Sequence, residues 1–298
     1  MNAREWGIAL LCCAIAADEL TPLTLAQLRT LGQRVRAMGM PSQLGAELQE
    51  KHLLAMGYHP EEAQRICALL NREARLERYL DGARARGITL LTRLSPEYPA
   101  RLHLQLGVDA PPVLFAAGNL DLLSRPAISL VGSRVLAEPG RLFAQRVGTL
   151  AAREDYVLVS GNAAGADQTG QNACLKEGGS IVAFVADELS RHLPRDGERQ
   201  LMLSESGYDV PFTAARALHR NHLIHALGEK TFVAQCTPGR GGTWSGTMEN
   251  LHRGWSEVYV CDDSSEATHA LCERGAAPIA LSKLNSLSGT RPAQCSFL

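Results

Sequence analysis

The stretch AISLVGSR occupies residues 127–134, and the stretch YVLVSGNAAGAD occupies residues 156–167. Each begins with a short run that is apolar on both faces and continues into a loop that contains glycine. Strands that are apolar on both faces belong to parallel sheets covered by helices. The two stretches therefore predict two strands of a parallel sheet, each with a glycine loop at its carboxyl end.

Similar patterning extends outward from these two stretches. From residue 87 onward, short β-rich runs alternate with helical ones, and the further strand-like runs are 88–91, 113–116, 181–186, 230–235 and 258–261. Strands that alternate with helices imply right-handed βαβ crossovers and a doubly wound sheet. We therefore predict an α/β fold for residues 87–262, with a mainly parallel sheet and helices on both faces.

The two ends of the chain do not show this alternation of strand-like and helical runs. Residues 1–80 show about four amphipathic helical segments, which predict a separate small helical domain. Its last segment carries a run of arginines, which forms either a solvated helix face or a face toward nucleic acid: Arg65, Arg72, Arg75 and Arg78. Residues 263–298 are rich in Ser, Ala and Leu without a clear pattern, and we predict no structure for this C-terminal tail.

Composition narrows the class of protein. The 298 residues are 45% hydrophobic but only 5% aromatic, so Leu, Ala and Val must fill the core. The net charge of −1 gives no general attraction for nucleic acid, so any such binding must come from a local patch or from backbone amides. No run approaches the ~20 apolar residues of a membrane span. The eight cysteines show no metal-binding spacing, and we expect unpaired thiols in a reducing cytoplasm.

Glycine loops follow three of the predicted strands. They begin at Gly132, at Gly161 and, after the run KTFVAQC, at Thr237. Ligands of doubly wound sheets bind outside the carboxyl ends of the strands. Glycine lets backbone N–H groups approach an anion closely, and a following helix adds a positive N-terminus. Three such loops at one edge predict a phosphate-binding site, although neither a Walker P-loop nor the pattern G-x-G-x-x-G is present.

The candidate residues for this site come from the loops and from one later helix. Arg134 and Arg220 can grip a phosphate in bidentate fashion, or each can form an ion pair with a carboxylate. Asp167 is expected to cap a helix, with a catalytic role as the alternative, and Asn221 to bond backbone or base or to cap a helix. The full set is Gly132, Ser133, Arg134, Ser160, Gly161, Gly165, Asp167, Arg220, Asn221, Arg240, Gly241, Gly242 and Thr243.

No metal, cofactor or catalytic residue is predicted. The histidines at 219, 222 and 225 form H-x-x-H-x-x-H. On a helix these side chains spread over more than one face, so a single metal ion would not reach all three. No spacing suggests a nucleophilic triad.

Several motifs in order resemble the DprA/Smf DNA-processing family over residues 87–262. They are Tyr98-Pro99, Pro111-Pro112-Val113-Leu114-Phe115, Gly118, Val131-Gly132-Ser133-Arg134, Ser160-Gly161-x-Ala163-x-Gly165-x-Asp167, Gly178-Gly179, Ser204-Glu205 and Arg220-Asn221-x-Leu223-Ile224. The resemblance implies an extended Rossmann-like fold after a small helical (SAM-like) domain. It also implies single-stranded DNA binding, loading of the recombinase RecA during transformation, and a homodimer.

The chain departs from the family pattern at the presumed phosphate site. Ala164 and His222 stand where the family has basic residues, Gly170-Gln171 replace Ala-His, and the run 241–247 replaces Ser-Gly-Ser-Leu-x-Thr-Ala. Each phosphate contact releases counterions, so lost contacts weaken DNA binding and flatten its salt dependence. We therefore expect weak, sequence-independent binding of single-stranded DNA without catalysis.

Two other functions stay open. The run Pro238-Gly239-Arg240-Gly241-Gly242-Thr243 is similar to the P-G-G-x-G-T-x-x-E motif of the related LOG phosphoribohydrolases, which cleave nucleotides. Gly246 stands where that motif has its glutamate, and the nearest carboxylate is Glu249. The loss of basic residues also suggests an antitoxin-like regulatory protein that acts through a protein partner.

Overall fold

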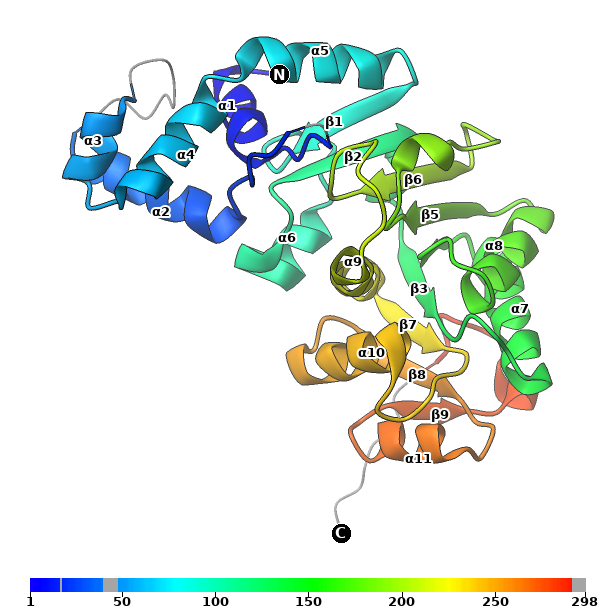
Figure 1. The fold of residues 1–298 in the computed structure, drawn as a ribbon. Coiled ribbons are helices and arrows are strands. Elements are labelled where there is room, and N and C mark those ends of the chain that lie inside the picture. Colours follow the sequence, from blue (N-terminus) through cyan, green and yellow to red (C-terminus); the bar gives the residue numbers. More distant parts are fainter. Residues whose placement is uncertain (17, 40–47, 291–298) are drawn as a thin grey trace. The chain divides into compact units, whose positions relative to one another are not determined.

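The computed structural model describes residues 1–16, 18–39 and 48–290 (Figure 1). The chain divides into two compact units by its internal contacts. Unit 1 contains residues 1–117, 187–193 and 203–211, and unit 2 contains residues 118–186, 194–202 and 212–298. No helix in the described part of the chain is long and apolar enough to cross a membrane.

Unit 1 is mainly helical. Its helices are α1 (Ala3–Cys12), α2 (Leu25–Ala37), α3 (Glu50–Ala55), α4 (Pro60–Leu70), α5 (Glu73–Arg84) and α6 (Ala100–Leu106). Strands β1 (Ile88–Thr92) and β2 (Val113–Gly118) pair antiparallel, with Leu90 opposite Phe115. A 3₁₀ turn, η1 (Gly107–Asp109), follows α6.

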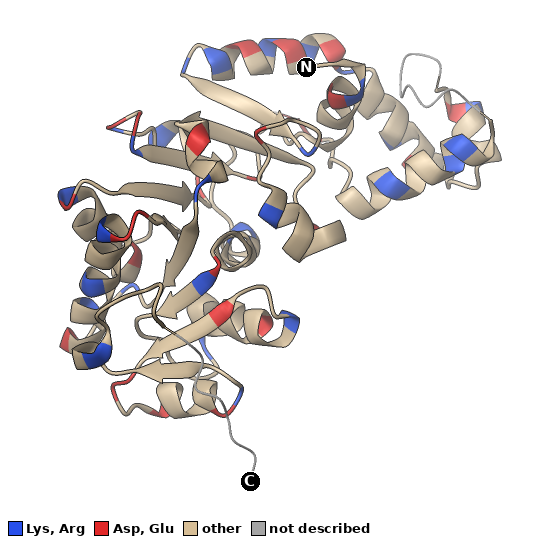
Figure 2. Cartoon of the chain, turned by 180° about the vertical axis from the view of Figure 1, so that it is seen from behind, with Lys and Arg blue, Asp and Glu red and all other residues tan. Residues whose placement is uncertain are grey.

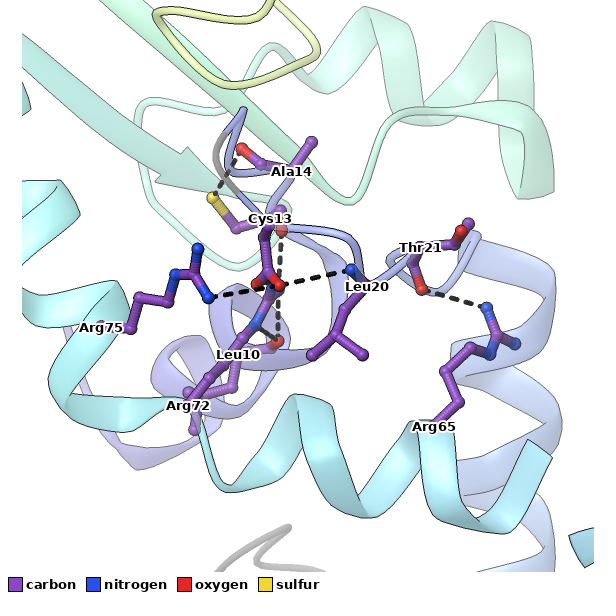
Figure 3. A network of polar contacts seen from close by, with 9 residues as sticks. Leu10, Cys13, Ala14, Leu20, Thr21, Arg65, Arg72 and Arg75 are labelled. Atoms are coloured by element: carbon purple, nitrogen blue, oxygen red, sulfur yellow. Dashed lines mark hydrogen bonds and ion pairs between the residues drawn. The ribbon is translucent and has the colours of Figure 1, made fainter. Parts of the chain in front are cut away.

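A buried arginine holds the end of α1 in place (Figure 3). Arg72 donates to the carbonyl oxygens of Leu10, at 2.7 Å, and of Cys13, at 2.6 Å. It also forms an ion pair with the Oδ2 atom of Asp18 at 2.9 Å. The last carbonyls of a helix have no partner within the helix, so this guanidinium supplies the missing donors.

The arginine run of the N-terminal region is therefore structural in part. Besides the buried Arg72, Arg75 forms an ion pair with Asp18, and Arg65 donates to the carbonyl of Thr21 at 3.1 Å. Arg72 thus belongs to no solvated face, whereas Arg75 and Arg78 are exposed. Both sequence interpretations were wrong for Arg72, because nothing in its spacing shows the helix end that it caps.

Unit 2 contains a mainly parallel sheet. Its strands are β3 (Ala127–Val131), β4 (Val157–Ser160), β5 (Ser180–Phe184), β7 (Lys230–Val233), β8 (Glu257–Cys261) and β9 (Ala277–Ile279), and β6 (Gln200–Ser204) contributes its first residues. The order is β6-β5-β4-β3-β7-β8-β9. All pairs from β5 to β9 are parallel, with Ser129 of β3 opposite both Val159 and Thr231.

Helices connect these strands. They are α7 (Glu138–Arg153), α8 (Ala166–Lys176), α9 (Ala214–Leu227), α10 (Gly241–Arg253) and α11 (Glu266–Cys272), with 3₁₀ turns η2 (Leu120–Ser124), η3 (Leu189–Arg191, in unit 1) and η4 (Leu281–Lys283). Helices α7 and α8 lie on one side of the strands and α9 and α10 on the other (Figure 1). The predicted fold class is confirmed, and residues 127–131 and 156–160 share one sheet.

Three elements were not predicted from the sequence. Strand β6 is short and lies between polar segments, so its apolar run was not recognised as a strand. In the region after residue 262, where no structure was predicted, the chain forms α11 and β9, and β9 adds a parallel strand beside β8. Leu284 and Leu287 of this region are fully buried in the core of unit 2.

Helices α7 and α8 approach each other at a pair of glycines. A Cβ atom on Gly148 would lie 2.1 Å from the carbonyl oxygen of Gly170, and one on Gly170 would lie 2.1 Å from a methyl group of Leu130. The contact between the two helices thus requires glycine at position 148, and the side chain of Leu130 leaves no room for a Cβ at position 170.

We expect Gly148→Ala to lower the free energy of unfolding by roughly 1–3 kcal/mol, because the added methyl group must separate two packed helices. Urea denaturation measures the change. Gly197→Ala is the control, since no atom lies within 4 Å of its Cβ position. Equal stability of the two variants would contradict the tight packing.

Candidate nucleic-acid interface

The three glycine loops meet at one edge of the unit 2 sheet. They follow β3, β4 and β7, and β3 pairs in parallel with both of the others. A cavity of about 900 Å³ opens there, lined by the first and third loops, by parts of the second loop and by α8, α9 and α10. Strand β4, which follows β3 along the chain, lies on one side of β3, and the later strand β7 lies on its other side. The cavity thus lies at the switch point where doubly wound sheets bind ligands.

The second loop packs directly on the first. Gly165 has φ = +83°, and a Cβ there would lie 2.2 Å from the carbonyl oxygen of Ser133. That oxygen accepts a hydrogen bond from the N–H of Ala166 at 3.1 Å. A Cβ on Gly132 would in turn lie 2.5 Å from the Cβ of Ala166. Glycine is therefore required at 165 by the close approach of a backbone carbonyl and at 132 by the side chain of Ala166.

The third loop is fastened to the first by hydrogen bonds. The N–H of Ser133 donates to the carbonyl of Gln235 at 2.8 Å. The hydroxyl of Thr243 donates to the carbonyl of Gly132 at 2.9 Å. Thr243, a predicted phosphate contact, thus uses its proton within the protein.

Asp167 and Arg220 lie buried against the second loop. The Oδ2 atom of Asp167 accepts hydrogen bonds from the N–H groups of Gly161 and Ala163, both at 3.1 Å. Arg220 donates to the carbonyl of Gly161 and, at 3.1 Å, to that of Phe184. Asp167 therefore binds the loop before α8 rather than capping the first turn of that helix. Both side chains fix the loop's shape.

Burial has the largest effect on the pKa of the Asp167 carboxyl group. It raises the pKa of the carboxyl group to about 6, against the lowering effects of Arg220, the two loop amides and Arg134. His225, also fully buried, is held neutral because burial lowers its pKa to about 3.

Two further arginines of the cavity are exposed, whereas Arg220 is buried. Arg134 and Arg240 are exposed and line the cavity, and within the described residues no carboxylate forms an ion pair with either. Helix α10 begins beside them without a side-chain cap. Exposed guanidinium groups beside an uncapped helix N-terminus are arranged to attract an anion.

The cavity brings most of the predicted site together. Ser160, Gly161 and Gly165 do not line it; Ser160 is buried and accepts a hydrogen bond from Gln171. Asn221 donates to the carbonyl of Gly242 at 2.9 Å, which is the predicted backbone role. The candidates that line the cavity are Gly132, Ser133, Arg134, Asp167, Arg220, Asn221, Arg240, Gly241, Gly242 and Thr243.

The cavity has an apolar wall, of which the sequence marked only Trp244 of α10, as the one aromatic residue near the loops, with packing in the core as its expected role. Phe212, half exposed, comes from the segment before α9, and Leu218 comes from α9. Phe212 follows no glycine loop, so only the fold shows that it reaches this edge. The three histidines of α9 belong to no group of metal-binding side chains in the described residues.

The fold and this cavity define a Rossmann-like α/β protein with exposed arginines and glycine loops at the carboxyl edge of a parallel sheet. The chain belongs to the DNA recombination-mediator protein A family, whose sequence model matches residues 89–287. This confirms the resemblance to DprA/Smf proteins.

Individual relatives agree with this assignment. The DNA processing protein DprA of Streptococcus pneumoniae is 30% identical over 181 residues, which are 56% of this chain and 63% of that protein. Protein Smf of Escherichia coli is 30% identical over 197 residues, 60% of this chain and 50% of that protein. The chain thus spans only part of the length of these relatives.

Two solved structures share the fold. The X-ray structure of DNA processing protein A from Streptococcus pneumoniae matches 98% of this chain and 99% of its own, with a TM-score of 0.75 and 23% identity. DNA processing protein A from Helicobacter pylori matches 64% of this chain and 90% of its own, with a TM-score of 0.55 and 21% identity.

The raised pKa of Asp167 predicts a pH-dependent contribution to stability. The folded protein binds this proton more tightly than the unfolded chain, whose pKa is near 3.8, so stability falls as the pH rises through the window from about 4 to 6. The free energy of unfolding of the wild type, relative to Asp167→Asn, should fall by about 1 kcal/mol between pH 5 and pH 7.

Urea titrations of the wild type and of Asp167→Asn at several pH values measure this difference. A wild-type advantage that grows with pH would show that the charged carboxylate is the favoured form in the folded protein.

Proposed function

We propose that this protein binds single-stranded DNA at the cavity of unit 2, as a DNA-processing protein of its family and without catalysis. The observation that carries the proposal is the pair of exposed arginines, Arg134 and Arg240, at the rim formed by the three loops. Family membership supports it, as does the single-stranded DNA binding mode described for the Helicobacter pylori protein.

The rim suits phosphate groups rather than particular bases. Arginine can hold a phosphate with two parallel hydrogen bonds, and the first N–H groups of α10 add further donors. Contacts of this kind position a strand but do not read its sequence. We therefore propose binding that is nearly independent of sequence, with Phe212 and Trp244 available to stack on bases.

The absence of catalysis is proposed from the surroundings of Gly246. A Cβ there would lie 3.1 Å from the Cβ of Asn221 and 3.2 Å from Nε2 of His225, so a glutamate would require both to shift. Glu249 forms an ion pair with Arg253 at 2.9 Å and does not line the cavity. This arrangement does not favour cleavage of a nucleotide.

The wider role is proposed from the family. Loading of a RecA-type recombinase and formation of a homodimer stay predictions, as does action through a regulatory protein partner. Location in a reducing cytoplasm likewise stays a prediction.

We expect Arg134→Ala to weaken binding of labelled single-stranded oligonucleotides by roughly 1–3 kcal/mol, about equally for all sequences, because a charge-assisted phosphate contact is lost. Ala164→Arg should tighten binding, since residue 164 is exposed in the second loop. The salt slope of the wild type should correspond to about 2–4 phosphates.

Fluorescence anisotropy over a salt titration measures all three. Arg274→Ala, which removes an exposed arginine outside the cavity, is the control. If the wild type fails to bind at low salt and Ala164→Arg gains nothing, the cavity is not a DNA site.

A further inference from the structure

A second cavity lies within unit 1, formed by residues that take no part in the DNA site. It measures about 530 Å³ and is an open groove between α1, α2 and the segment that follows β1. Its floor is apolar and comes from Ile8, Leu25 and Leu28. Leu94, 49% exposed, adds an accessible apolar surface at the margin.

Arginines surround this floor. Arg4 comes from α1, Arg29 and Arg36 from α2, and Arg93 from the segment after β1. Within the described residues no carboxylate lines the groove, and Arg4, Arg29 and Arg36 form no ion pair. Helix α2 contains arginines but no acidic residue, as its bands in Figure 2 show. Among the residues that the structure describes, the positive charge of the groove therefore has no carboxylate partner.

The residues of α2 that line the groove recur at helical spacing. Arg29, Gly32, Gln33 and Arg36 lie three, four and seven residues apart, so they share one side of the helix. Glycine inside a helix is destabilising relative to alanine. Gly32 has no positive φ, and its Cβ position has only Nη1 of Arg36 within 4 Å, at 3.8 Å. Internal packing thus does not require this glycine, but a bound chain could use the space.

We propose that this groove docks an acidic amphipathic helix of a partner protein. The apolar side of such a helix would cover the floor and Leu94, and its carboxylates would pair with the four arginines. A groove with an apolar floor is the usual receptor for an amphipathic helix. Charge complementarity selects an acidic one.

A nucleic acid fits these observations less well. The phosphate backbone makes no use of an apolar floor, and no aromatic side chain lines the groove to stack on bases. The sequence model of the family begins at residue 89, so residues 1–88 lie outside it. Most residues that line the groove therefore belong to the part of unit 1 that this family model does not match.

The test uses two synthetic helical peptides of about 18 residues, each with leucines on one face and either glutamates or lysines on the other. The full-length protein should bind the glutamate peptide saturably and the lysine peptide at least about tenfold more weakly. The double variant Arg29→Glu/Arg36→Glu should lose at least about tenfold in affinity for the glutamate peptide. Arg78→Glu/Arg84→Glu, which reverses two exposed arginines of α5, should change it less than about twofold.

Gly32→Leu supplies a second variant, which fills the groove without changing charge. It should abolish peptide binding while thermal stability is kept or raised. Equal binding of both peptides, or equal losses in the two double variants, would overturn the proposal. A selective loss of single-stranded DNA binding in Arg29→Glu/Arg36→Glu would also overturn it, by assigning this face to nucleic acid.

Discussion

The site depends on the close approach of two loop backbones at Gly165. The residue lies so near the carbonyl of Ser133 that any side chain would collide with it. This contact joins the second loop to the first, and the hydrogen bonds of Ser133 and Thr243 join the third loop to the first. Arg134 directly follows Ser133, so the position of its guanidinium at the cavity also follows from the packing of glycine on backbone.

The buried charged residues at the second loop and the exposed arginines of the cavity have separate roles. Asp167 and Arg220 are buried and bind the loop's own amides and carbonyl, so they shape the site. Arg134 and Arg240 are exposed and free to meet an anion. Arg134 and Arg220 were both predicted either to grip phosphate or to form ion pairs, and their different burial separates them. A chain with a net charge of −1 can thus offer a positive edge, because Arg134 and Arg240 form no ion pair with a carboxylate of the described residues.

Much of the fold could be predicted because buried parallel strands leave continuous apolar runs, as in residues 127–131 and 156–160. The short strand β6 and the strand β9 leave weaker signals and were missed. In the site, glycine loops marked the edge of the sheet correctly. Other features of the site depend on contacts between residues that are distant in sequence. They are the hydrogen bonds of Arg220 and Thr243 to backbone carbonyls and the position of Phe212 at the cavity. Spacing along one chain carries no record of such contacts.

The central claim is that loop packing at Gly165 builds the DNA site. Single-stranded DNA affinity of Gly165→Ala, measured beside Gly197→Ala, tests it most directly. Gly197 is an exposed glycine of unit 2 with open space at its Cβ position. We expect Gly165→Ala to bind about tenfold more weakly or worse while still unfolding cooperatively, and Gly197→Ala to bind as the wild type does. A folded Gly165→Ala protein with wild-type affinity would contradict the account.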